Sequence, residues 1–103
     1  MIKTTFTDPW TDINNYPDSM RQYIHKQLAI ELHPDHELYG KPLKVIARRE
    51  GRDDVLMADL SSDEVYLVHL TYATSQQTGA FPISKRLNDV QTFLNQANDD
   101  WSL

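Results

Sequence analysis

The chain has 103 residues, of which 40% are hydrophobic, and it carries a formal net charge of −5. This length fits one domain with its own core, and the composition lies in the globular range, which excludes wholesale disorder. Because the chain has no cysteine, disulfide bonds, thiolate zinc sites and cysteine nucleophiles are excluded as well.

The negative charge is concentrated in the second half of the chain. Residues 1–51 carry seven Lys/Arg and seven Asp/Glu, whereas residues 52–103 carry three and eight. Such a surface repels phosphate backbones, which disfavours nucleic-acid binding, and it attracts a basic protein partner. The alternative is that mild acidity only confers solubility. No apolar run approaches the ~20 residues of a membrane helix, and the first residues lack a signal-peptide pattern, so we predict a cytoplasmic protein that does not contact membranes.

Residues 1–17 are predicted to be a lead-in segment, followed by a single α+β domain over residues 18–103. The lead-in contains three large aromatic residues separated by polar and turn-forming residues: Phe6, Trp10 and Tyr16. Because large aromatic side chains rarely remain in water, we expect some of them on the domain surface or at a contact with another chain. Trp10 is therefore a candidate binding residue, as is Trp101 near the other end of the chain.

A helix is predicted to begin near Asp18 or Ser19 and to end near His33. Four apolar residues recur every four positions and form one helical face: Met20, Ile24, Leu28 and Leu32. His33 precedes a proline, which disfavours helical geometry at that position. Residues 34–42 are predicted to form a loop.

Three strands are predicted next, over residues 43–49, 54–60 and 65–72, and the short turns between them indicate antiparallel pairing. In the first strand, alternation places three apolar side chains on one face of the sheet: Leu43, Val45 and Ala47. The third strand is apolar on both faces, which is typical of a strand covered on both sides.

The remainder of the chain is predicted to end in a helix. Residues 83–87 are expected to be extended, and the helix begins near Asn88, where Asn88 and Gln91 have the spacing of a capping box. Its apolar stripe consists of Val90, Phe93, Leu94 and Ala97. The predicted fold class is therefore α+β, with an N-terminal helix, a three-stranded antiparallel β-meander and a C-terminal helix, in the order α-β-β-β-α.

The densest cluster of metal-binding residue types lies just after the first helix. Imidazole and carboxylate groups bind zinc, nickel or iron, so His33, Asp35 and His36 are candidate metal ligands. His25 would stand ~12 Å from His33 along the helix, too far to share one ion. The alternative is a polar loop at a helix C-terminus, where the helix dipole favours imidazolium. Ligand sets normally need a third or fourth converging donor, and we expect no cofactor.

His69 is a candidate functional residue in the third predicted strand. A working histidine there needs a partner, such as Asp59 across the hairpin, and an open pocket above it. The alternative is a core histidine walled in by packing, with both ring nitrogens hydrogen-bonded. Tyr72, at the end of the same strand, is a further candidate binding residue. No serine lies in a nucleophile motif, and three glycines are too few for a phosphate-binding loop.

Three stretches of the sequence together resemble a small family of uncharacterised bacterial α+β proteins. They are His33-Pro34 through Leu38-Tyr39-Gly40-Lys41, then Asp53-Asp54-Val55-Leu56, and then Val68-His69-Leu70-Thr71. The resemblance spans roughly half of the chain and consists of packing patterns, and Tyr72 stands where tryptophan is expected. It implies neither an activity nor any site residues.

Three functions are compatible with these patterns. The first is a small, acidic, non-enzymatic domain that binds or regulates a basic protein partner. The second is a small hydrolase that uses a metal ion or a histidine. The third is a structural component that self-associates through its aromatic residues or through an open sheet edge.

Overall fold

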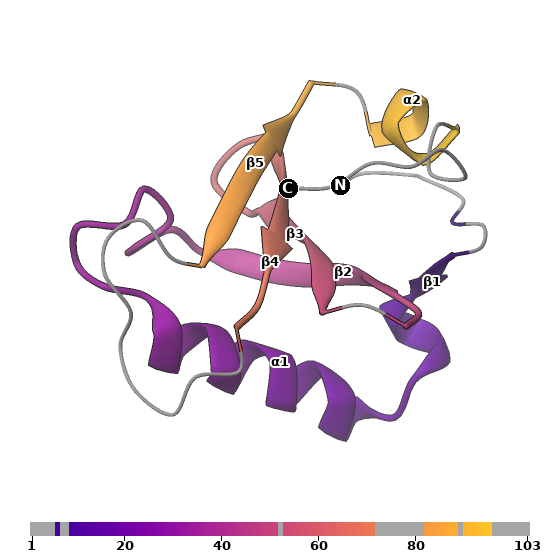
Figure 1. Cartoon of the computed structure of the whole chain (residues 1–103), viewed down its shortest axis with the longest axis horizontal. Coiled ribbons are helices and arrows are strands. Elements are labelled where there is room, and N and C mark those ends of the chain that lie inside the picture. Colours follow the sequence, from indigo (N-terminus) through magenta and orange to yellow (C-terminus); the bar gives the residue numbers. More distant parts are fainter. Residues whose placement is uncertain (1–5, 7–8, 52, 72–81, 89, 96–103) are drawn as a thin grey trace.

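A computed structural model of the chain describes residues 6, 9–51, 53–71, 82–88 and 90–95. Its centre is a five-stranded antiparallel sheet in the order β1-β2-β3-β4-β5 (Figure 1). The strands are β1 (Trp10–Asp12), β2 (Leu43–Arg49), β3 (Asp54–Asp59), β4 (Val65–His69) and β5 (Ile83–Leu87). The helical elements are the 3₁₀ turn η1 (Ile13–Asn15), helix α1 (Asp18–Glu31) and the short helix α2 (Val90–Asn95).

The predicted α-β-β-β-α fold is wrong, because the sheet has five strands and one of the two flanking helices, α2, has only six residues. Strands β2, β3 and β4 lie within the predicted ranges, and β1 and β5 extend the sheet at its two edges. Strand β1 has three residues, too few to show an alternating pattern, and Leu87 is the one buried residue of β5. Edge strands need little apolar surface, so hydrophobic periodicity detects them poorly.

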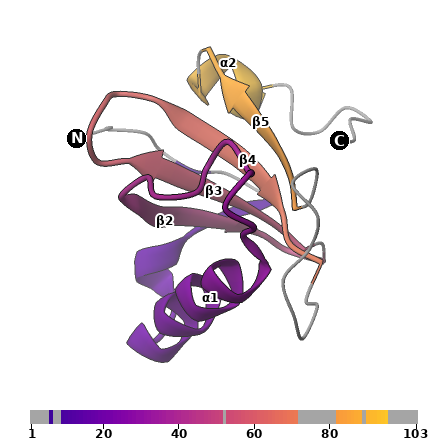
Figure 2. The same cartoon turned by 90° about the vertical axis from the view of Figure 1, so that its left-hand side faces the viewer.

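The two faces of the sheet carry separate cores, and the two helices lie on opposite sides of it (Figure 2). The core on the α1 side, the α1 core, is formed by Ile13, Ile24, Leu28, Leu32, Leu38, Val45, Val55, Met57, Tyr66, Val68 and Leu70. The core on the other side, the α2 core, is formed by Trp10, Ala47, Leu56, Val65, Leu67, Leu87 and Leu94. Because β4 contributes to both cores, its side chains are apolar on both faces.

A β-bulge between Val45 and Ala47 changes the direction of the side chains along β2. Val45 pairs with Met57 and Ala47 pairs with Leu56, so one extra residue lies between the two pairs. Val45 therefore belongs to the α1 core and Ala47 to the α2 core. The prediction that they share a face is wrong, because one extra residue moves every later side chain to the opposite face.

Residues 10–15 lie within the segment expected to be a lead-in, and the structure places them in the sheet and in η1. The Glu50 N–H donates to the Pro9 carbonyl at 2.8 Å, which extends the contact between β1 and β2. Trp10 is 1% exposed and packs on Phe93 of α2, with ring centroids 5.8 Å apart. Within the described residues, neither helix has the length and apolar character needed to cross a membrane.

His25 connects α1 to the bulge in β2. Its Nε2 accepts a hydrogen bond from the Val45 N–H at 3.3 Å, which only a neutral ring with a free lone pair on this atom can do. Burial, and after it the positive charges of Arg21 and Lys44, lower the pKa of His25 from its ordinary value of 6.5.

This contact makes the stability of the domain depend on pH. The pKa of His25 is lower in the folded state than in the unfolded state, so between the two values the unfolded chain binds more protons. The free energy of unfolding should therefore fall as the pH is lowered from 6.5 toward the folded-state pKa, and it should be fully recovered above 6.5. Urea unfolding at several pH values measures this slope. His25→Gln, which keeps an acceptor without titrating, should flatten it, whereas Gln22→Ala, which changes an exposed non-titrating residue of the same helix, should not. Equal slopes for the two variants would contradict the assignment.

Candidate functional site

Five residues, one from each strand, form a row across one end of the sheet: Trp10, Arg49, Asp54, His69 and Ile83. Trp10 pairs with Arg49, Asp54 with His69, and His69 with Ile83. Arg48 pairs with Val55, which places Arg49 beside Asp54. The antiparallel register therefore aligns an arginine, an aspartate and a histidine on the face that carries the α2 core.

The three polar residues of this row are joined through the Asp54 carboxylate. Its Oδ1 lies 2.5 Å from Nδ1 of His69, and its Oδ2 lies 3.8 Å from Nη1 of Arg49. The Asp54 side chain is 6% exposed, whereas the His69 side chain is 42% exposed. A buried carboxylate thus fixes one nitrogen of an imidazole that remains in contact with solvent, which is how an orienting acid holds a general base.

The partner of His69 differs from the one the sequence suggested. Asp59 lies at the other end of β3, where its Oδ1 accepts hydrogen bonds from the N–H and Oγ of Ser61 at 2.9 and 2.6 Å. These bonds, with a smaller contribution from the charge of Lys41, lower the pKa of Asp59, although burial opposes the shift. His69 is also not walled in by packing as expected, so the hydrolase alternative stays a prediction.

The structure brings two of the three candidate metal ligands together. Nδ1 of His33 accepts from the Asp35 N–H at 3.0 Å and lies 3.6 Å from Oδ2 of the same residue. His36 is buried, accepts from the Leu38 N–H at Nδ1, and donates from Nε2 to the Pro82 carbonyl at 2.7 Å. Both nitrogens of His36 are thus occupied, and His36 links the loop after α1 to the start of β5. Among the residues the structure describes, no group of three His, Cys, Asp or Glu side chains is placed to hold a metal ion.

The other three candidate binding residues have different outcomes. Trp10 is buried in the α2 core, so its side chain is not presented to a partner. Tyr72 and Trp101 lie outside the described residues, and their assignment as binding residues stays a prediction.

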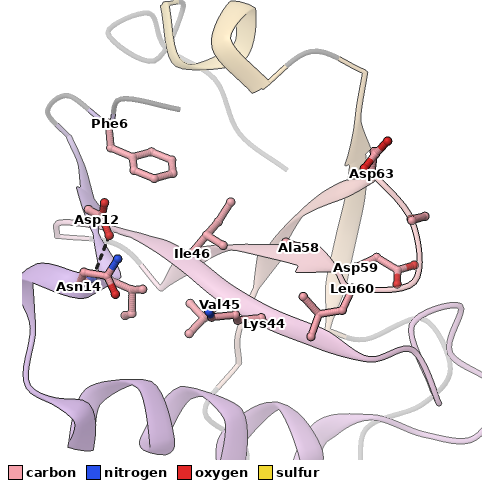
Figure 3. A pocket seen from close by; sticks show the side chains of 12 residues that line it. Phe6, Asp12, Asn14, Lys44, Val45, Ile46, Ala58, Asp59, Leu60 and Asp63 are labelled. Carbon is pink, nitrogen blue, oxygen red and sulfur yellow. Dashed lines mark hydrogen bonds between the residues drawn. The ribbon is translucent and has the colours of Figure 1, made fainter. Parts of the chain in front are cut away.

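A cavity of about 410 Å³ lies beside the first half of β2, at a place that the sequence did not indicate (Figure 3). Strand β1 pairs with residues 47–49 alone, so among the described elements no strand pairs with residues 43–46 of β2 on the side that faces away from β3. The apolar residues that line it, in the described part of the chain, are Phe6, Ile13, Val45, Ile46, Ala58 and Leu60. The charged side chains around it, within the described residues, are Asp12, Asp59, Asp63 and Lys44. We call this site, together with the uncovered main chain of residues 43–46, the edge groove.

The main chain of β2 presents hydrogen-bonding groups to the edge groove. The Leu60 N–H donates to the Pro42 carbonyl at 2.8 Å, so Pro42 directs its carbonyl toward β3. In an antiparallel strand the direction of these groups alternates, so those of Leu43 and Val45 point away from β3, toward the uncovered side. The Val45 N–H is bonded to His25. The groups directed to this side are therefore the Leu43 N–H and the carbonyls of Leu43 and Val45.

The fold and these sites define a small α+β domain built on an antiparallel five-stranded meander. Comparisons with protein-family models, with curated proteins and with solved structures found no match to this chain.

Proposed function

We propose that this chain is a non-enzymatic cytoplasmic domain that binds a basic protein partner at the edge groove. The single observation that carries the proposal is the uncovered half of β2 beside an apolar cavity with an acidic rim. Sheet edges with unpaired main-chain groups are sites where other chains add, and natural proteins usually cover or charge them. Strand β1 ends at Asp12, and η1, which follows it, contacts β2 without adding to the sheet, so strand pairing on this side covers only residues 47–49 of β2.

Exposed apolar surface beside the edge supports a protein ligand. Leu60 is 65% exposed and lies in the turn between β3 and β4, next to Ala58 at the cavity wall. An isolated exposed leucine is ordinary, but here it continues an apolar surface that includes Phe6 and Ile46. An apolar centre with a polar rim is the usual construction of a protein interface.

The charge of the edge groove supports a basic partner. Of the described residues that line it, three are aspartates and one is a lysine, and the whole chain has a net charge of −5. Asp59 is buried and pairs with Lys41 at 3.6 Å, so Asp12 and Asp63 carry the accessible negative charge. Long-range attraction would therefore guide a positively charged surface toward this side of the domain.

Site-specific photocrosslinking in the native host tests the proposal. A photoreactive phenylalanine analogue at position 60, on the rim of the edge groove, should capture one partner protein. The same analogue at position 23 is the matched control, since Tyr23 is 52% exposed but lies on α1. The captured protein is then purified, and calorimetry should detect binding to the wild-type domain that Asp63→Lys weakens. Capture of the same proteins from both positions, or no binding between the purified proteins, would contradict the proposal.

A further inference from the structure

We infer that the edge groove takes its partner as an extended segment, whose main chain pairs with residues 43–46 of β2 and whose arginine or lysine side chain enters the cavity. The inference rests on the proposed function and names the chemistry of the ligand. It commits to an extended basic segment of another protein because the described rim of the cavity is predominantly acidic.

The main chain of β2 leaves a position for an added strand beside residues 43–46. Strand β1 already pairs with residues 47–49 in antiparallel fashion, so a segment along residues 43–46 lies in line with it. The Leu43 N–H and the Leu43 carbonyl point to the same side, and a residue of the added strand can bond to both. His25 occupies the Val45 N–H, so the pairing is centred on Leu43.

The cavity beside the strand edge can accept a long cationic side chain. Phe6, Ile46 and Ala58 offer an apolar wall against which the methylene stem of arginine or lysine can pack. Asp63 is exposed at the rim and can accept from the cationic end of that side chain, as a carboxylate does from a guanidinium. Figure 3 shows Phe6, Ile46 and Asp63 around the same opening.

The two edges of the sheet differ in a way that fits this choice. Strand β5 carries Lys85 and Arg86, which are exposed, and such charged residues protect an edge from unwanted pairing. The uncovered part of β2 carries Lys44 as its exposed charged residue. Strand addition is thus opposed at β5 more than at β2. The basic residues of β5 also make a second copy of the chain the main competing occupant of the edge groove.

Defined peptides test the inference with the full chain. The probe is a fluorescent eight-residue peptide, blocked at both ends, in which arginine and valine alternate. One matched peptide has proline in place of each valine, which keeps the charge but removes main-chain donors, and another has glutamate in place of each arginine. Fluorescence anisotropy should detect binding of the arginine–valine peptide and of neither matched peptide. Hydrogen exchange of the Leu43 amide should slow when this peptide is present.

Protein variants locate the binding site. Asp63→Lys should weaken the binding of the arginine–valine peptide by about fivefold to tenfold, the range expected when one exposed ion pair becomes a repulsion. Asp53→Lys makes the same change in net charge at the other end of β3, where Asp53 is also exposed, and should leave the affinity unchanged. Equal weakening by the two variants would show a non-specific charge effect and would overturn the inference.

Four further outcomes would also overturn it. Equal binding of the proline peptide, or an unprotected Leu43 amide in the presence of bound peptide, would exclude strand pairing. A dimer in light scattering that Asp63→Lys converts to monomer would make a second copy the occupant. If no peptide binds while position 60 still crosslinks to a partner that binds when purified, the extended-segment inference fails but the proposed function stands.

Discussion

Replacing Glu31 with alanine should lower the free energy of unfolding by about 3 kcal/mol, because it removes a buried carboxylate that accepts three hydrogen bonds, one of them from the buried Gln27. Glu31 is 0% exposed at the end of α1. Its Oε1 accepts from the N–H and Oγ1 of Thr71 at 2.9 and 2.8 Å, and its Oε2 accepts from Nε2 of Gln27 at 2.8 Å. The carboxylate thus fastens α1 to the chain just after β4. Urea unfolding followed by circular dichroism measures the loss.

Glu31→Gln keeps the volume of the side chain and changes its hydrogen bonds, so it separates these two contributions to stability. Glutamine keeps one acceptor oxygen for Thr71 but replaces the other with a donor that faces the amide of Gln27. We therefore expect about half of the loss seen with alanine. Glu37→Gln, an exposed position in the following loop, is the control and should stay within about 0.5 kcal/mol of wild type. If Glu31→Ala were as stable as this control, the carboxylate would not be an anchor.

The parts of the fold that can be predicted from the sequence are those with repeated patterns. The four-residue spacing of Ile24, Leu28 and Leu32 marks the buried face of α1, and all three are in the α1 core. The doubly apolar pattern of β4 indicates a strand covered on both faces, and its residues are divided between the two cores. In both elements the packing agrees with the pattern, because the side chains of a regular helix or strand return to the same face with the period of the element.

The rest of the fold depends on single residues that leave no periodic signal. The bulge at Val45 is one additional residue in an otherwise regular strand, yet it decides that Ala47 belongs to the α2 core. Strand β1 is held by its pairing with β2 and by burial of one large side chain, Trp10, and it carries no local strand pattern. Glu31 lies beside the apolar stripe of α1, and nothing in its neighbours along the sequence distinguishes it from an exposed helix residue.

The candidate site depends on register even more than the fold does. The sequence suggested that His69 pairs with Asp59, whereas the β3–β4 hairpin pairs it with Asp54. If the turn between β3 and β4 lay a few residues further along the chain, His69 would lie opposite Asp59 and not opposite Asp54. The position of the turn therefore decides which aspartate of the strand becomes the partner. The edge groove was not predicted, since it exists only because β1 stops at Asp12 while β2 continues. Whether a strand has a neighbour on each side is a property of the assembled sheet and has no local sequence signal.

Replacing Trp10 with alanine should lower the free energy of unfolding by about 3–5 kcal/mol, the range observed when a fully buried aromatic side chain is truncated. Trp10 is 1% exposed, and it packs against Phe93 of α2 in the core on that face of the sheet. Trp10→Phe keeps an aromatic ring, so its free energy of unfolding should fall by clearly less than that of Trp10→Ala. Tyr23→Ala, at an exposed position on α1, is the control and should change stability by no more than about 0.5 kcal/mol. Chemical unfolding of the three variants measures these differences.

The same residue tests whether the domain begins at residue 18. If the first 17 residues were only a lead-in, a chain of residues 18–103 would unfold at the same denaturant concentration as the full chain. Because Trp10 fills the α2 core and β1 covers part of β2, we expect the shortened chain to lose cooperative unfolding. An unchanged midpoint would mean that the α2 core closes without Trp10, and Trp10→Ala would then be tolerated as well. Both experiments therefore have to agree, since each removes the same buried ring.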